Sequence, residues 1–216
     1  MLKLGNIKVT INDFVILRGI NLELAAGELV ALVGRNGAGK TTTLKSIMGL
    51  VSIAGGSIDF DGQDLLAVPP HQRAALGIGY VPEDRRLIGS LTVQDNILMP
   101  AWANKLDTAD ERLDYIYGLM PELAPFVKRR ASMLSGGQQK MVALARALMS
   151  GTKLLLLDEP FEGLSPGLGN KFGETIQQLQ KDGLTVLLAE SDDKTIDFAG
   201  KTYIIERGET VDGAAG

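Results

Sequence analysis

Short apolar runs alternate along the chain with longer stretches in which apolar residues recur at helical spacing. The runs predict strands at Ile7–Ile11, Ile20–Leu24, Leu29–Val33, Ser57–Phe60, Ile78–Val81, Lys153–Leu157, Leu184–Ala189 and Thr202–Glu206. Three runs are continuous rather than alternating, as expected where helices cover both faces of a sheet: Leu29–Val33, Leu154–Leu157 and Val186–Ala189. The pattern therefore predicts an α/β fold.

Helical spacing predicts helices at Gly39–Met48, Val93–Ala101, Ala109–Met120, Gln138–Met149, Leu168–Lys181 and Asp193–Ala199. The middle of the chain, roughly residues 84–135, is mostly helical and contains Pro100, Pro121 and Pro125. We interpret this part as a helical subdomain inserted between strands of an α/β core. Residues 1–216 are expected to form a single domain that contains this subdomain.

Composition narrows the classes of function. The chain has 216 residues, of which 45% are apolar, enough for one large domain with a hydrophobic core. No apolar stretch approaches the ~18–20 residues that span a bilayer, and the first residues do not read as a secretory signal. The lack of cysteine excludes disulfides and thiolate nucleophiles, and the single histidine, His71, is interpreted as a surface residue. A net charge of −4 argues against a nucleic-acid partner.

Residues 34–41, called the phosphate loop below, read GRNGAGKT and match the pattern G-x-x-x-x-G-K-[ST]. The pattern lies between a predicted strand and a predicted helix, where backbone N–H groups and a helix N-terminus can face an anion. Lys40 would reach the β- and γ-phosphates, and the hydroxyl of Thr41 would bind Mg²⁺. The residues expected to bind ATP are Gly34, Arg35, Asn36, Gly37, Ala38, Gly39, Lys40, Thr41 and Thr42. The chain is therefore predicted to bind a nucleoside triphosphate.

Two apolar runs end in an acid: LLLLDEP at residues 154–160 and TVLLAESD at residues 185–192. In the first run a proline ends the strand, and adjacent side chains on a strand point to opposite faces. Asp158 is therefore expected to face Mg²⁺, and Glu159 to activate the water that attacks the γ-phosphate. An exposed acidic turn is the alternative. In the second run, Glu190 is interpreted as a strand-end acid held by backbone groups or solvent.

The segment LSGGQQK at residues 134–140, called the signature segment below, opens a predicted helix with Ser135 as its N-cap. Glycine in a first helical turn costs roughly 1 kcal/mol relative to alanine. Stability therefore does not explain the two glycines, whereas close approach of the backbone to an anion does. The residues expected to contact a nucleotide are Leu134, Ser135, Gly136, Gly137 and Gln138. An ordinary N-capped helix is the alternative.

The order of GRNGAGKTT, LSGGQQK and LLLLDEP resembles that of the ATP-binding-cassette ATPases, over nearly the whole chain. The resemblance implies a P-loop NTPase core with an antiparallel β subdomain and an inserted helical subdomain. It also implies that the signature of one cassette closes on the ATP and Mg²⁺ held by a second cassette. Transmembrane permease subunits, and indirectly a solute-binding protein, would be further partners. The chain would then lie peripherally on the cytoplasmic face of the inner membrane.

Two further stretches, GIGYVPEDRRLIGSLTVQDNI at residues 77–97 and DEPFEGLSP at residues 158–166, narrow the resemblance. They resemble the ATPase subunits of branched-chain amino acid importers and their urea and amide relatives. Most cassettes have glutamine after YVP, and that subfamily often has the glutamate found here as Glu83. The resemblance places Glu83 near Mg²⁺ and the attacking water, with Thr41 and Asp158 as the other metal ligands. A solvated loop acid is the alternative for Glu83.

Three positions depart from the family pattern. The aromatic residue that stacks on adenine falls by position at Ile11, and Phe14 is the nearest aromatic that could replace it. The loop after DEP usually ends in aspartate, where this chain has Ser165. The second apolar run usually ends in a histidine that contacts the γ-phosphate. This chain has Ser191 instead, which we interpret as a weakened phosphate sensor in the catalytic site.

Three functions stay open at this point. The first, which the intact Asp158 and Glu159 favour, is an importer ATPase for branched-chain amino acids or a related small polar solute. The second is a non-transport cassette ATPase in nucleic-acid or assembly work, although this chain lacks the long insertion or second cassette typical of such proteins. The third is a degenerate cassette that binds ATP as a regulatory partner, which Ser191 and Ser165 favour.

Overall fold

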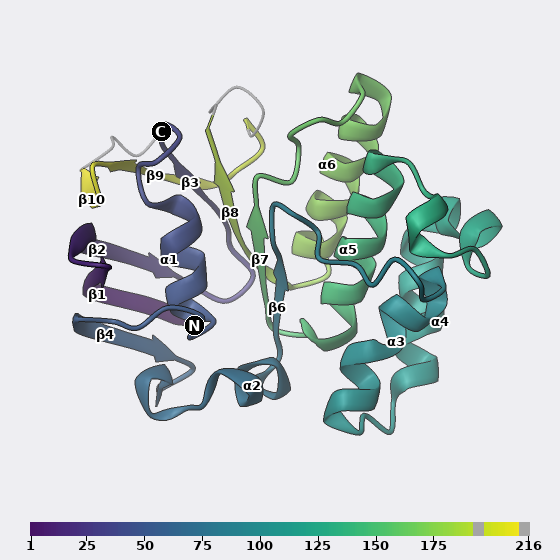
Figure 1. Cartoon of the computed structure of the whole chain (residues 1–216), viewed down its shortest axis with the longest axis horizontal. Coiled ribbons are helices and arrows are strands. Elements are labelled where there is room, and N and C mark those ends of the chain that lie inside the picture. Colours follow the sequence, from purple (N-terminus) through teal and green to yellow (C-terminus); the bar gives the residue numbers. More distant parts are fainter. Residues whose placement is uncertain (192–196, 212–216) are drawn as a thin grey trace.

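Ten strands among the described residues, 1–191 and 197–211, form one sheet in the computed structural model. The strand order across the sheet is β5-β4-β1-β2-β10-β9-β3-β8-β7-β6. The strands are β1 (Leu2–Ile11), β2 (Phe14–Leu24), β3 (Leu29–Val33), β4 (Gly55–Phe60), β5 (Gln63–Asp64), β6 (Ile78–Val81), β7 (Leu154–Asp158), β8 (Thr185–Glu190), β9 (Lys201–Glu206) and β10 (Glu209–Val211). In Figure 1, β1, β2 and β4 lie at one end of the molecule, and the central strands lie between them and the helices.

The strands β1 and β2 form an antiparallel hairpin, and β4 pairs with the other edge of β1. The hairpin turns at Asn12 and Asp13, whose φ angles of 48° and 66° lie in the left-handed region that these residue types tolerate. Buried side chains such as Leu2 and Leu4 alternate with exposed ones along β1, as in a sheet with one covered face. The antiparallel β subdomain expected from the sequence is therefore present.

The strands β3, β8 and β7 are parallel neighbours, and β6 pairs with β7 at the edge of the sheet. Val33 at the end of β3 pairs with Glu190, and Asp158 at the end of β7 pairs with Ala189. Because parallel strands end at the same edge of a sheet, the loops that follow these strands meet there. The second acid-ending run therefore lies directly beside the strand that precedes the phosphate loop.

Helices cover both faces of this central sheet (Figure 1). They are α1 (Lys40–Ile47), α2 (Pro70–Arg73), α3 (Val93–Asn104), α4 (Ala109–Leu119), α5 (Gly136–Ser150) and α6 (Pro166–Lys181), with 3₁₀ segments η1 (Leu65–Ala67), η2 (Ala74–Leu76), η3 (Pro121–Phe126) and η4 (Ala131–Met133). Val30 and Leu32 of β3 share a core with α1, whereas Leu29 and Ala31 share a core with α5 and α6. Successive residues of β3 thus face different cores, which explains its continuous apolar run.

The segment between β6 and β7 is helical, as predicted, and contains α3, α4, η3, η4 and α5. Figure 1 shows α3 and α4 at the opposite end of the molecule from β1 and β2. α3 begins with a capping box between Thr92 and Asp95, and it continues to Asn104 through Pro100, beyond its predicted end. In the part of the chain that the structure describes, no helix combines the length and apolar character needed to cross a membrane.

Several boundaries differ from the predicted ones for local reasons. α5 begins at Gly136, earlier than predicted, because Ser135 and Gln138 form a capping box. β10 is absent from the predicted elements, because it consists of only 3 residues after a tight turn at Arg207 and Gly208, both with positive φ. The predicted helix at Asp193–Ala199 lies largely outside the described residues.

Candidate nucleotide-binding and hydrolysis site

The phosphate loop joins β3 to α1 at the edge of the sheet where the parallel strands end. A Cβ at Gly34 would lie 2.3 Å from the carbonyl oxygen of Ile205 in β9, so only glycine fits there. Gly39 has a φ of 116°, which other residues rarely adopt, and it directly precedes Lys40, the first residue of α1. The phosphate loop therefore needs glycine at Gly34 because β9 lies so close, and at Gly39 because of its backbone conformation.

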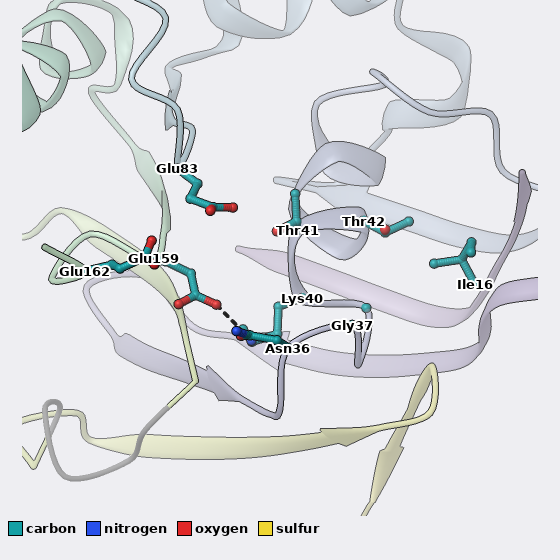
Figure 2. Close-up of a pocket in the computed structure, with 10 residues that line it drawn as sticks. Ile16, Asn36, Gly37, Lys40, Thr41, Thr42, Glu83, Glu159 and Glu162 are labelled. Atoms are coloured by element: carbon teal, nitrogen blue, oxygen red, sulfur yellow. Dashed lines mark ion pairs between the residues drawn. The ribbon is translucent and has the colours of Figure 1, made fainter.

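A cavity of about 460 Å³ opens beside the phosphate loop (Figure 2). Its lining comes from β2, the phosphate loop, the start of α1 and the loops after β6 and β7: Ile16, Asn36, Gly37, Gly39, Lys40, Thr41, Thr42, Glu83, Glu159 and Glu162. In Figure 2 the carboxylate of Glu83 points across the cavity toward Thr41. The fold thus brings together residues of three motifs that are far apart in the sequence.

Lys40 is only 4% exposed and lines this cavity. Its Nζ atom donates a hydrogen bond to the carbonyl oxygen of Gly34 at 2.6 Å and forms an ion pair with Oε1 of Glu159 at 2.9 Å (Figure 2). The sequence places no cation close to Glu159, so this pair arises from the fold. Because both side chains are largely buried, each charge offsets the desolvation of the other.

Asp158 is 1% exposed and lies between two hydroxyl groups. Thr41 Oγ1 donates to Oδ1 at 3.0 Å, and the hydroxyl of Tyr80 donates to Oδ2 at 3.2 Å. Burial raises the pKa of Asp158, and the two hydroxyl donors partly oppose this rise. A carboxylate beside a threonine hydroxyl supplies the oxygen ligands that Mg²⁺ accepts together with phosphate and water. Thr41 and Asp158 therefore fit a bound Mg²⁺.

Glu159 follows β7 directly, and its polar groups are all engaged. Its φ of 46° is unusual for a residue other than glycine. Its N–H donates to the carbonyl oxygen of Ala189 at 2.9 Å, and its own carbonyl oxygen accepts a hydrogen bond from Lys140 Nζ at 2.7 Å. Ser191 Oγ donates to Oε2 at 2.9 Å, while Oε1 pairs with Lys40. Ser191 therefore contacts the very acid that is expected to activate water.

Glu190, at the end of β8, is also buried, with 4% exposed. One of its carboxylate oxygens accepts the N–H of Phe161 at 3.1 Å, and its carbonyl oxygen accepts the N–H of Gly34 at 3.2 Å. Burial is the main reason that the pKa of Glu190 rises to about 7. The prediction that backbone groups hold this strand-end acid is confirmed.

The signature segment lies at the start of α5, and Ser135 is the N-cap, as predicted. Leu134–Gln138 are not among the described residues that line the cavity, and Ser135 and Gly136 are exposed. A Cβ at Gly137 would lie 2.3 Å from the side chain of Leu168 in α6. This atom is the end of a flexible, half-buried side chain that can move aside, so packing alone does not require glycine here, and the approach of the two glycines to an anion stays a prediction.

Two of the residues considered for adenine, Ile11 and Phe14, lie at the β1–β2 hairpin and are 40% and 75% exposed. Neither is among the described residues that line the cavity, whereas Ile16 of β2 is. Arg35 and Ala38 of the phosphate loop also lie away from the lining, the first exposed and the second buried. Ile16 therefore supplies an apolar side chain at the cavity, whereas the family resemblance led us to expect an aromatic one.

Sequence reasoning missed Ile16, Tyr80 and Lys140. Lys140 has a detectable signal, because it lies at helical spacing from the buried Leu144, where a solvated lysine is not expected. Tyr80 has no such signal, since its contact with Asp158 depends on β6 lying beside β7.

Comparison with known proteins places these features in a family. A family model described as ABC transporter matches residues 17–162. The chain is 39% identical over 196 residues to the high-affinity branched-chain amino acid transport ATP-binding protein BraG of Pseudomonas aeruginosa, covering 90% of this chain and 84% of the relative. It is 33% identical over 210 residues to the probable branched-chain amino acid transport ATP-binding protein LivF of Archaeoglobus fulgidus, covering 96% and 89%. It is also 35% identical over 200 residues to the lipopolysaccharide export system ATP-binding protein LptB of Escherichia coli K12, covering 91% and 83%.

Solved structures agree with this placement. The ADP conformation of an ATP-binding cassette from an ABC transporter matches with a TM-score of 0.86 at 25% identity, covering 100% of this chain and 91% of that chain. A dimeric post-hydrolysis cassette bound to ADP and Pi matches with a TM-score of 0.87 at 27% identity, covering 97% and 96%. The expected P-loop NTPase core is thereby confirmed. This chain belongs to the ABC transporter family, as an ATP-binding subunit with the ATPase activity of that family.

Proposed function

We propose that this chain is the ATP-binding subunit of an importer for branched-chain amino acids or a related small polar solute. It would act peripherally on the cytoplasmic face of the inner membrane. Similarity to BraG and LivF over most of the chain supports the solute class, and Glu83 after YVP agrees with that subfamily. The observation that carries the catalytic part is the cavity that gathers the phosphate loop, Glu83 and Glu159.

Nucleotide binding is assigned to the phosphate loop and Lys40. Lys40 forms an ion pair with Glu159, so a γ-phosphate would have to attract Lys40 away from that carboxylate. The same exchange leaves Glu159 free to accept a proton. Thr41 and Asp158, with Glu83 across the cavity, would hold Mg²⁺, which neutralises part of the phosphate charge when bound.

Hydrolysis is assigned to Glu159 as the general base. It would take a proton from the water that attacks the γ-phosphate, a role that contributes typically 10²–10⁴-fold to a rate. The hydrogen bond from Ser191 holds one oxygen of this carboxylate, so that the other can face the water once Lys40 has left. Glu83 lies opposite and is assigned a supporting role at Mg²⁺ and this water.

A second cassette is part of the proposal, because Ser135 and Gly136 of the signature segment are exposed and do not line the cavity of their own chain. Leu134–Gln138 would close on the phosphates held by that cassette, which is either a copy of this chain or a different one. Similarity to cassettes solved as dimers, at 27% identity, supports this arrangement. Permease subunits would receive the resulting motion, and a solute-binding protein would act on them from the other side.

Two other functions have specific support. Lipopolysaccharide export is favoured by the 35% identity to LptB. A regulatory cassette with weak hydrolysis is favoured by Ser191 at the position of the usual histidine. The contact of Ser191 with Glu159 nevertheless keeps the base in place, which favours a cassette that hydrolyses ATP.

The proposal is tested with the membrane subunits and partner cassette that co-purify with the tagged chain. Their complex is placed in proteoliposomes containing ATP, and uptake of labelled leucine is measured with the solute-binding protein outside. Uptake that depends on ATP supports the importer. A complex that fails to move branched-chain amino acids but releases lipopolysaccharide would overturn the proposed solute class. It would favour lipopolysaccharide export instead.

The ATP site is tested by Lys40→Ala. Loss of this charge-assisted hydrogen bond should weaken Mg-ATP binding by about 10–100-fold and abolish uptake at limiting ATP. Lys45→Ala, in the last turn of the same helix, is the matched control. Unchanged affinity for Mg-ATP in Lys40→Ala, measured by equilibrium binding, would show that nucleotide binds elsewhere.

A further inference from the structure

Lys140 is a buried cation in α5, one turn from the signature glycines. It lies in the first half of α5, is 6% exposed, and donates from Nζ to the carbonyl oxygen of Glu159 at 2.7 Å. No carboxylate forms an ion pair with it among the described residues. Burial lowers the pKa of Lys140, and the charges of Glu162, Glu190 and Glu83 act in the opposite direction. Burying an ammonium group that bonds to a single backbone oxygen is unfavourable. We therefore ask what the hydrogen bond to the carbonyl oxygen of Glu159 contributes to function.

The oxygen that Lys140 contacts belongs to a residue in an unfavourable backbone conformation. Glu159 has a φ of 46°, and such a conformation costs on the order of 1–3 kcal/mol unless its surroundings hold it. Two strong hydrogen bonds do so, one on each side of its Cα atom. The N–H is fixed to Ala189 in β8 at 2.9 Å, and the carbonyl oxygen is fixed to Lys140 in α5.

The backbone of Glu159 sets the direction of its carboxylate. In this conformation Oε1 reaches Lys40 at 2.9 Å and Oε2 reaches Ser191 at 2.9 Å, at the wall of the nucleotide cavity. The carbonyl oxygen also accepts the N–H of Glu162, at the longer distance of 3.3 Å. Without the ammonium of Lys140 only this weaker bond would remain on that side, so the residue could relax to an ordinary negative φ, and its side chain would leave this position. A displacement of about 1 Å at a reacting group can reduce a rate by about 100-fold.

We propose that Lys140 is a positioning residue for ATP hydrolysis, which holds the backbone of Glu159 in its left-handed conformation and thereby aims the carboxylate at the attacking water. The inference rests on the proposed role of Glu159 as the base. It also gives α5 two tasks, because the signature segment at its start would serve the partner's site while Lys140 serves its own.

The first test is a kinetic comparison in the assembled complex. Lys140→Met keeps the length of the side chain but removes the donor, and kcat should fall about 10–100-fold with KM for ATP changed less than about twofold. Lys140→Arg restores a charged donor and should recover part of kcat. Arg112→Met is the matched control, because Arg112 is a half-buried cation that also bonds to a carbonyl oxygen of α5, that of Leu148, away from the cavity. Its kcat should stay close to that of the parent.

A double substitution distinguishes an effect of Lys140 on the position of Glu159 from a general loss of ATPase activity. In a Glu159→Gln background the base is already absent, so adding Lys140→Met should lower the residual rate by less than about twofold. An equal further loss in that background would overturn the proposal, as would a parental kcat in Lys140→Met. If the parent shows no turnover, or if Glu159→Gln keeps full turnover, the function proposed for this site fails, whatever Lys140 does.

A structural readout does not depend on turnover. In a crystal structure of ATP-free Lys140→Met, Glu159 should have a negative φ, or its ion pair with Lys40 should be broken. A Glu159 in the same conformation as here would contradict the proposal. Should Lys140→Met fail to fold, Lys140→Gln serves the same measurements, because its side chain is shorter and neutral.

Discussion

Lys40 and Glu159 neutralise each other at the wall of the cavity, and their side chains are 4% and 12% exposed. Separating such a pair without replacement leaves an uncompensated buried charge, which is strongly unfavourable. Under the proposed mechanism ATP would bring the replacement, since its γ-phosphate would attract Lys40 when Glu159 is needed as a base. If Glu159 is the base, as proposed, the ion pair would hold it in an inactive contact until nucleotide binds.

Ser191 occupies the position of the usual histidine and donates to Glu159 rather than reaching far into the cavity. A histidine there could donate a charge-assisted hydrogen bond to the γ-phosphate, worth roughly 1.5–3 kcal/mol. Ser191→His should therefore raise the steady-state ATPase rate of the assembled complex, by about tenfold or less if part of that energy is realised. Ser52→His, on the exposed connection between α1 and β4, is the control. An unchanged rate would mean that this cassette hydrolyses ATP efficiently without a histidine.

Glu190 should make stability depend on pH. Burial raises its pKa from the ordinary 4.5 to about 7, so between these values the folded chain keeps a proton that the unfolded chain has released. Its contribution is fully present below pH 4.5 and is lost as the pH rises through about 7. The free energy of unfolding should fall over this range by on the order of 3 kcal/mol, at about 1.4 kcal/mol per unit of pKa.

The Glu190→Gln variant measures this contribution, because glutamine can still accept the N–H of Phe161 but does not titrate. Urea unfolding at a series of pH values should give a flatter pH dependence in the variant than in the parent. Glu206→Gln, at an exposed position of β9, controls for the change in net charge. Parallel pH profiles for the parent and Glu190→Gln would show that Glu190 is ionised in the folded chain throughout.

Arg73 joins α1 to the segment before β6. Its guanidinium is buried and donates to the carbonyl oxygens of Ser46 and Ile47 at the end of α1 and to those of Leu65 and Val68. Arg73→Met should lower the free energy of unfolding by about 3–5 kcal/mol, because it removes charged hydrogen bonds and leaves buried carbonyls unsatisfied. The measurement is the midpoint of denaturant unfolding at an unchanged slope. Arg18→Met, at an exposed position of β2, should shift the midpoint little, and an equal shift in both variants would contradict this role.

The elements that the sequence predicts best are those with long, continuous apolar runs. β3, β7 and β8 are covered on both faces, so each is a continuous apolar run, which predicts a buried strand. Short elements are harder, since β5 and β10 contain 2 and 3 residues and form only because a partner strand lies beside them. The start of α5 shows a third case, in which a side-chain cap, rather than the apolar pattern, decides the first residue.

Some parts of the candidate site can be predicted from the sequence, whereas others depend on the fold. The phosphate loop, Asp158 and Glu159 follow from contiguous motifs, because several residues of one short segment act on the same ligand. The ion pair of Lys40, the bond from Lys140 and the contact of Ile16 with the cavity join segments that are distant in the chain. Such contacts depend on strand order and helix packing, which a motif does not contain.

Across the whole molecule, the antiparallel end, the central sheet and the helical end surround one incomplete site. The cavity receives residues from β2, the phosphate loop, α1 and the loops after β6 and β7, whereas the exposed Ser135 and Gly136 of the signature segment do not line it. Under the proposed function a single chain would bind ATP and would present its signature segment to a second cassette. The match to a dimeric post-hydrolysis cassette over 97% of the chain agrees with this arrangement.

The central claim is that this chain hydrolyses ATP with Glu159 as the base. The most direct test is single-turnover hydrolysis of Mg-ATP by the assembled complex, comparing the parent, Glu159→Gln and the exposed control Glu174→Gln in α6. Glu159→Gln should bind Mg-ATP as the parent does but hydrolyse it more slowly, by on the order of 10²–10⁴-fold, while Glu174→Gln keeps the parental rate. Hydrolysis by Glu159→Gln at the parental rate would contradict the account and place the base elsewhere.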